Sequence, residues 1–130
     1  MPIRPLEALA DAIMYAEGWR PCSVSNRNRN PGNLRRGDYQ IGTDPEGYAV
    51  FTDLIAGYGA LLRDLAGKVS GKNEHGLGPE STIQQLCDVY APRGDHNNPD
   101  VYCYNICWWL DRALGRPIAS STKLSELMGE

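Results

Sequence analysis

The chain has 130 residues, 42% of them hydrophobic, and a net charge of -3. This length allows one domain with one hydrophobic core, and the composition excludes a disordered chain. The slight negative charge argues against a protein that binds nucleic acid through many phosphate contacts. We therefore expect a single domain over residues 1–130, with no nucleic-acid partner.

The N-terminal segment lacks the features of an export signal. Met1–Pro5 has no long apolar stretch, and Asp11 interrupts the apolar residues that follow. Nowhere does the chain approach the roughly 18 consecutive apolar residues of a membrane span. We expect synthesis in the cytoplasm, with no membrane span.

The first predicted helix covers Pro5–Ala16, where apolar residues recur at helical spacing. Gly18 is expected to end it. A long irregular segment follows, from Trp19 to about Val50, and loops of this length in small domains are usually functional. Within it, Tyr39–Ile41 and Tyr48–Phe51 are predicted as short strands of a hairpin.

Four further helices are predicted from the same periodicity. Their ranges are Asp53–Val69, Thr82–Val89, Pro99–Leu114 and a short C-terminal Thr122–Met128. Thr52 and Asn98 are the expected N-caps of the first and third, and Thr82 with Gln85 fits a capping box. The predicted fold class is mainly α, with four to five helices and a small irregular or β lobe between the first two.

Glu17 is the main candidate for chemistry. It lies at the end of the first helix, where the helix dipole disfavours a negative charge. Its apolar neighbours Met14, Tyr15 and Trp19 could desolvate the carboxyl and raise its pKa. A carboxyl that stays protonated near neutral pH is what glycosidic cleavage needs as a general acid. The alternative is a solvated Glu in a last helical turn.

An amide-rich turn follows in the segment Asn30–Arg35. Amide and guanidinium groups suit sugars, whose hydroxyl and N-acetyl groups need both donors and acceptors. The predicted substrate-binding residues of this segment are Asn30, Gly32, Asn33 and Arg35. Tyr48 and Tyr102 are candidates for stacking against sugar rings, as are Trp19 and Tyr39. The alternative is a Pro-Gly turn with no further role.

These features resemble the lysozyme-like superfamily of peptidoglycan-cleaving enzymes, especially lytic transglycosylases and N-acetylglucosaminidases. The resemblance rests on Glu17, on the Asn30–Arg35 turn, on Val89–Pro92 and on the helix start at Asn97–Tyr102. It covers roughly Leu6 to Leu114, and small phage-borne domains with the Asn-Pro-Gly-Asn signature are the most similar.

The resemblance implies a lysozyme-like fold that cleaves β-1,4 bonds in the glycan strand of peptidoglycan. It implies Glu17 as the single general acid, and it places the phenol of Tyr90 near that acid. The expected ligand is peptidoglycan or another N-acetylated oligosaccharide, and no cofactor or metal is expected. A phage particle, a holin pore or a secretion system would deliver the protein to the cell wall.

A second carboxylate is not obvious from the sequence. Asp38, Asp44 and Glu46 lie in the lobe that could face Glu17, although each also fits a turn. In lytic transglycosylases one Glu protonates the leaving oxygen and then deprotonates the sugar 6-hydroxyl. The sequence leaves open both this chemistry and hydrolysis.

Two other classes of function remain alternatives. One is a non-catalytic virion or cell-wall-binding module with the same fold. The other is a Cys/His peptidase or amidase, which would pair Cys87 with His96 or Cys22 with His75. Cys87 lies on an apolar helical stripe, which favours a core position, and two His residues are too few for an evident zinc site.

Overall fold

The computed structural model describes residues 4–93 and 97–129. Six helices and one two-stranded sheet lie in these residues. The helices are α1 (Pro5–Ala16), α2 (Val24–Arg27), α3 (Leu54–Ser70), α4 (Ile83–Tyr90), α5 (Pro99–Leu114) and α6 (Leu124–Leu127). The strands β1 (Gly42–Thr43) and β2 (Ala49–Val50) pair antiparallel, with Gly42 opposite Val50. The prediction of a mainly α fold with a small β lobe before the second long helix is confirmed.

The helix boundaries follow local capping chemistry. Thr82 and Gln85 form the expected capping box of α4, and the Asn98 side chain accepts from two backbone N–H groups at the start of α5. The prediction of Thr52 as a cap is wrong. Asp53 caps α3 instead, since its carboxylate accepts from the backbone N–H of Ala56. In the part of the chain that the structure describes, no helix is long and apolar enough to cross a membrane.

The lobe differs from the prediction in two places. The first strand is Gly42–Thr43 rather than Tyr39–Ile41, because Tyr39 has a φ of 66° and cannot extend a strand. A turn at Gly37 forms there instead, with the Gln40 side chain accepting from the backbone N–H of Gly37. The short α2 was not predicted, and Ser23 caps it.

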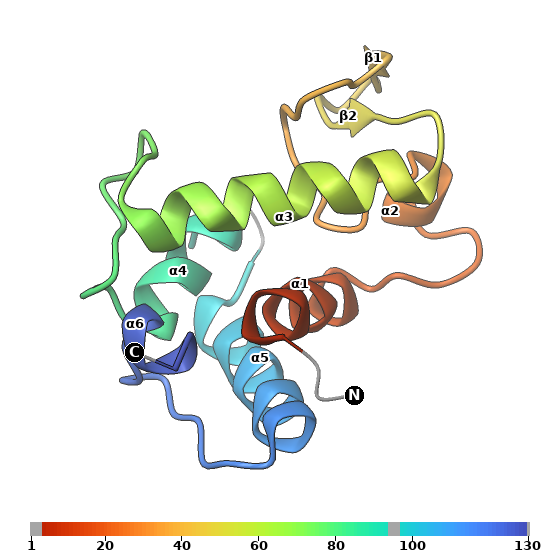
Figure 1. Cartoon of the computed structure of the whole chain (residues 1–130). Coiled ribbons are helices and arrows are strands. Elements are labelled where there is room, and N and C mark those ends of the chain that lie inside the picture. The colour runs from red at the N-terminus through yellow and green to blue at the C-terminus, as the bar shows by residue number, and fades with distance from the viewer. Residues whose placement is uncertain (1–3, 94–96, 130) are drawn as a thin grey trace.

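The long helices surround one core. Helix α1 packs against α3 and α5, and α4 packs against α5, as Figure 1 shows. The largest fully buried apolar side chains come from all of these helices, from the lobe and from α6: Leu9, Ile13, Phe51, Leu61, Leu65, Ile83, Leu86, Ile106, Leu110, Leu124 and Leu127. Helix α2 and the hairpin lie at the N-terminal end of α3 (Figure 1).

The segment after α2 is fixed from two sides. On one side, the backbone N–H groups of Ala49 and Phe51 donate to the carbonyls of Leu34 and Asn28, each at 2.9 Å. On the other side, the segment lies directly against α3, where a Cβ added to Gly57 would overlap the carbonyl oxygen of Arg29. These contacts hold the Asn30–Arg35 turn in one place relative to the helices.

Candidate active site

Glu17 joins three segments that are far apart in the sequence. It caps the C-terminus of α1, where its backbone N–H donates to the carbonyl of Ile13. The Tyr102 hydroxyl, from α5, donates to Glu17 Oε2 at 2.8 Å. The Asn33 side-chain amide, from the turn after α2, donates to Glu17 Oε1 at 3.2 Å. The carboxyl is therefore held in a defined position.

The Glu17 carboxyl is shifted towards its protonated form. Burial raises its pKa from 4.5 to about 7, although the hydrogen bonds from Tyr102 and Asn33 act in the opposite direction. Desolvation dominates because a charged carboxylate loses more hydration than two donors restore. Near neutral pH, both the acid and the carboxylate are populated, as a group that first donates and later accepts a proton requires.

Asn33 suits both protonation states of Glu17. It closes a turn, with its backbone N–H donating to the Asn30 carbonyl at 3.0 Å, and its φ of 46° is one that Asn tolerates. Its Oδ1 is buried and has no hydrogen-bond partner among the described residues. Rotating the Asn33 amide by 180° would exchange its oxygen and nitrogen, so that the oxygen would accept the O–H of a neutral Glu17. The orientation of an amide is assigned from the hydrogen bonds around it.

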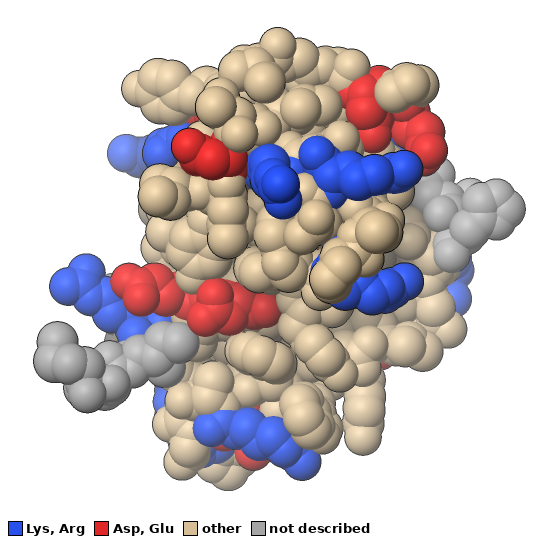
Figure 2. Space-filling model, turned by 90° about the vertical axis from the view of Figure 1, so that its right-hand side faces the viewer, with Lys and Arg blue, Asp and Glu red and all other residues tan. Residues whose placement is uncertain are grey.

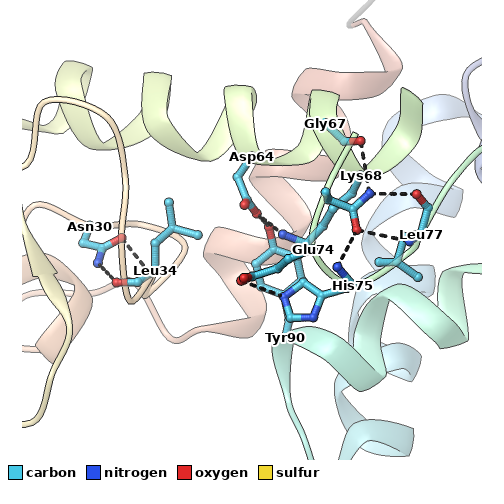
Figure 3. A network of polar contacts seen from close by, with 10 residues as sticks. Asn30, Leu34, Asp64, Gly67, Lys68, Glu74, His75, Leu77 and Tyr90 are labelled. Atoms are coloured by element: carbon cyan, nitrogen blue, oxygen red, sulfur yellow. Dashed lines mark hydrogen bonds and ion pairs between the residues drawn. The ribbon is translucent and has the colours of Figure 1, made fainter. Parts of the chain in front are cut away.

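A cavity of about 660 Å³ opens beside Glu17. Five of the sequence-predicted residues line it: Glu17, Asn33, Arg35, Tyr48 and Tyr90. Leu34 lies on one side of it and Tyr90, Glu74 and His75 on the other, with α3 running above them in Figure 3. The structure thus brings the end of α1, the turn after α2 and the end of α4 together around one hollow.

Three predicted residues lie behind the cavity wall. Tyr102 is buried, and its hydroxyl binds Glu17. Asn30 is 0% exposed, and its side chain donates to the carbonyls of Leu34 and Ala49 and accepts from the Leu34 N–H. Gly32 is packed against α3, since a Cβ there would lie 2.7 Å from Leu61 Cδ1. Asn30 and Gly32 therefore shape the turn that presents Asn33.

Arg35 and Tyr48 form one unit at the cavity edge. The Arg35 guanidinium lies 4.1 Å from the centre of the Tyr48 ring and donates to the Glu46 carbonyl at 2.6 Å. This stacking places a cation beside an aromatic face, which suits a sugar with an attached carboxylate. On the face in Figure 2, which carries α2 and the hairpin, Lys and Arg side chains are spread across the upper half, with Asp and Glu side chains among them.

The acids of the lobe do not line this cavity. Asp44 accepts from the Asn28 amide and from the backbone N–H groups of Glu46 and Tyr48, so its interpretation as a turn residue is confirmed. Asp38 forms a surface ion pair with Arg63 at 3.1 Å. Among the residues that the structure describes, the carboxylates that line the cavity besides Glu17 are Asp64 and Glu74.

Sequence reasoning missed the α3 side of the cavity. Asp64 Oδ2 accepts from Lys68 Nζ at 2.6 Å and from the Tyr90 hydroxyl (Figure 3). Lys68 is only 5% exposed. Asp64 and Lys68 are four residues apart, and the apolar stripe of the helix includes Leu61 and Leu65. A charged pair inside such a stripe was the available signal.

The described cysteines take no part in the wall of the cavity. Within residues 4–93 and 97–129, no Cys lines this cavity, and no group of three or more His, Cys, Asp or Glu is arranged to hold a metal ion. Cys87 is buried in the core, where a hydrogen bond with Cys103 and burial raise the pKa of its thiol. His75 lies 3.6 Å from Glu74, and His96 lies outside the described residues.

No family model, no curated protein and no solved structure matches this chain. The cavity and the carboxyl group at its wall are therefore the basis for assigning a function.

Proposed function

We propose that this protein cleaves β-1,4 glycosidic bonds in the glycan strand of peptidoglycan, with Glu17 as the general acid. The observation that carries the proposal is a partly buried carboxyl group beside a polar cavity, whose desolvation raises its pKa to about 7. Few side chains can donate a proton at neutral pH, and this one is also held in position by Tyr102 and Asn33.

The reaction begins with proton transfer from Glu17 to the leaving glycosidic oxygen. The bond between this oxygen and the anomeric carbon breaks, and its electron pair goes to the oxygen, so that the sugar develops oxocarbenium-like charge. The Glu17 carboxylate then removes a proton from the group that attacks the anomeric carbon. If that group is water, the product has a reducing end; if it is the sugar's own 6-hydroxyl, the product has a 1,6-anhydro end.

The cavity wall supplies groups that fit such a ligand. Asn33 holds the Glu17 carboxyl at the wall, and the Arg35 guanidinium on Tyr48 offers the ligand a cation and an aromatic edge. Lactyl and stem-peptide carboxylates of peptidoglycan would bind best near Arg35 and Arg36, which both line the cavity.

Digestion of purified sacculi, with mass spectrometry of the soluble fragments, tests the proposal. We expect the wild-type protein to release muropeptides and Glu17→Gln to release at least about a hundredfold less, the usual contribution of a general acid. Glu7→Gln, in the first turn of the same helix and away from the cavity, is the control and should retain activity. Sacculus binding without any released fragments from the wild type would support a non-catalytic cell-wall module instead.

A further inference from the structure

Tyr90 and Tyr102 are two phenols whose hydroxyl groups are both committed to carboxylates. Tyr102 donates its only hydroxyl hydrogen to Glu17, and Tyr90 donates its own to Asp64. A phenol whose hydroxyl hydrogen is already donated can only accept a hydrogen bond from a further partner. Of the two, Tyr90 lines the cavity, which puts its phenol next to a ligand bound there.

Asp64 is fixed by a buried cation. Lys68 Nζ lies 2.6 Å from Asp64 Oδ2 and 5.1 Å from the centre of the Tyr90 ring. Because Lys68 is 5% exposed, its ammonium group requires a partner, and Asp64 provides the ion pair. The same carboxylate oxygen accepts from both side chains, as Figure 3 shows, so the three groups lock one another in place.

Tyr90 also retains its hydrogen. Burial is the largest cause that raises the pKa of its phenol, followed by the charge of Asp64, and the charge of Glu17 adds to the effect. Tyr90 and Glu17 line the same cavity. The hydroxyl therefore stays neutral beside Glu17, with its hydrogen directed to Asp64.

We propose that Asp64, braced by Lys68, is a positioning residue that presents the Tyr90 oxygen as a hydrogen-bond acceptor to the bound sugar. The ligand group that it accepts from is a donor, either a sugar hydroxyl or the N–H of an N-acetyl group. This inference rests on the proposed function, because it takes the ligand to be an N-acetylated oligosaccharide. Tyr90 would contact the ligand, whereas Asp64 and Lys68 would act only through Tyr90.

A double-mutant cycle tests this order of action, with tri-N-acetylchitotriose as the ligand and binding followed by NMR titration. Tyr90→Phe removes the acceptor and should weaken binding by about tenfold, the loss expected for one hydrogen bond. The charge-free pair Asp64→Asn with Lys68→Met avoids leaving a buried ammonium unpaired. It should weaken binding to a similar extent in the wild-type background and have no further effect in the Tyr90→Phe background.

Independent, multiplicative losses would overturn the positioning role, and unchanged binding by Tyr90→Phe would overturn the acceptor role. If the charge-free pair does not fold, Tyr90→Phe alone still decides whether the phenol oxygen contacts the sugar. The hydroxyl proton of Tyr90 then provides the second readout. It should be observable and slow to exchange in the wild type, and a fast-exchanging proton contradicts its bond to Asp64.

The test of Tyr90 and Asp64 can fail or succeed independently of the test of glycan cleavage. If the wild type binds the trisaccharide but releases no fragments from sacculi, the cycle still reports on Tyr90 while the catalytic proposal fails. If sacculi are cleaved and Tyr90→Phe changes neither affinity nor kcat/KM, only the inference about Asp64 and Tyr90 fails.

Discussion

The protonation of Glu17 makes the free energy of unfolding depend on pH. Its pKa is raised from 4.5 to about 7, so the folded state binds more protons than the unfolded state between these values. The free energy of unfolding therefore falls as the pH rises from about 4.5 through 7. By linkage, this contribution amounts to about 3 kcal/mol.

Glu17→Gln should remove that pH dependence. We expect the difference in unfolding free energy between the variant and the wild type to shift by about 3 kcal/mol in favour of the variant between pH 4 and pH 8. Urea denaturation at several pH values measures it, and the comparison cancels the titration of other groups. Parallel stability curves for the two proteins would show that Glu17 titrates normally.

The hydrogen bond from Tyr102 lowers the pKa of Glu17, whereas burial raises it. Its hydroxyl donates to the ionised carboxylate and so lowers the pKa of Glu17. Tyr102→Phe keeps the buried ring and removes this bond, so the pKa should rise by roughly one to two units, given the strength of hydrogen bonds to charged groups. The alkaline limb of kcat/KM should move to higher pH by the same amount. A limb that stays in place or moves to lower pH contradicts the role of Tyr102.

At the scale of elements, the turn after α2 depends on close approach to α3. Gly57 faces the Arg29 carbonyl without room for a side chain, whereas a Cβ at Gly59 would meet only the flexible end of Arg63, at 3.3 Å. Both glycines lie in α3, where Ala is otherwise favoured by about 1 kcal/mol. The two positions therefore form a matched pair.

Gly57→Ala should destabilise the protein by about 1–3 kcal/mol, because the clash outweighs the gain in helix propensity. Gly59→Ala should leave stability unchanged or raise it by up to about 1 kcal/mol. Denaturant unfolding of both variants measures the difference. Equal stability of the two would mean that the turn does not press against α3.

The helices were predictable because their signals are local. Apolar spacing and caps such as Asn98 lie within a few residues of the helix that they define. The strand predicted over Tyr39–Ile41 is absent, because the turn at Gly37 gives Tyr39 a left-handed backbone that no local pattern of the sequence indicated. Short elements such as α2 have too few residues to show a period.

The candidate site was predictable in part, for the same reason. The place of Glu17 at the end of α1 follows from the helix boundary. The three-dimensional path of the turn decides which amide faces the cavity. The sequence therefore could not show that Asn33 lines the cavity while Asn30 is buried. Asp64 and Lys68 have the spacing of an ordinary surface ion pair, and their place beside the apolar stripe was the one local sign that Lys68 is buried, which the structure shows together with the Tyr90 ring near its ammonium group.

At the scale of the whole molecule, the cavity exists only where separate segments meet. Glu17 from α1, Asn33 from the turn and Tyr102 from α5 are joined by two hydrogen bonds, and α3 and α4 complete the wall. Because these segments also share the hydrophobic core, the acid and its environment form together on folding. A raised pKa at Glu17 is therefore a property of the complete fold.

The most direct test of the account is an NMR titration of the Glu17 side-chain carboxyl carbon, assigned by its absence from Glu17→Gln, together with the pH profile of kcat/KM on sacculus fragments. We expect Glu17 to titrate with a midpoint near 7 and kcat/KM to fall as the pH rises through that midpoint. A midpoint near 4.5, or a kcat/KM that does not fall where Glu17 loses its proton, would contradict its role as the general acid.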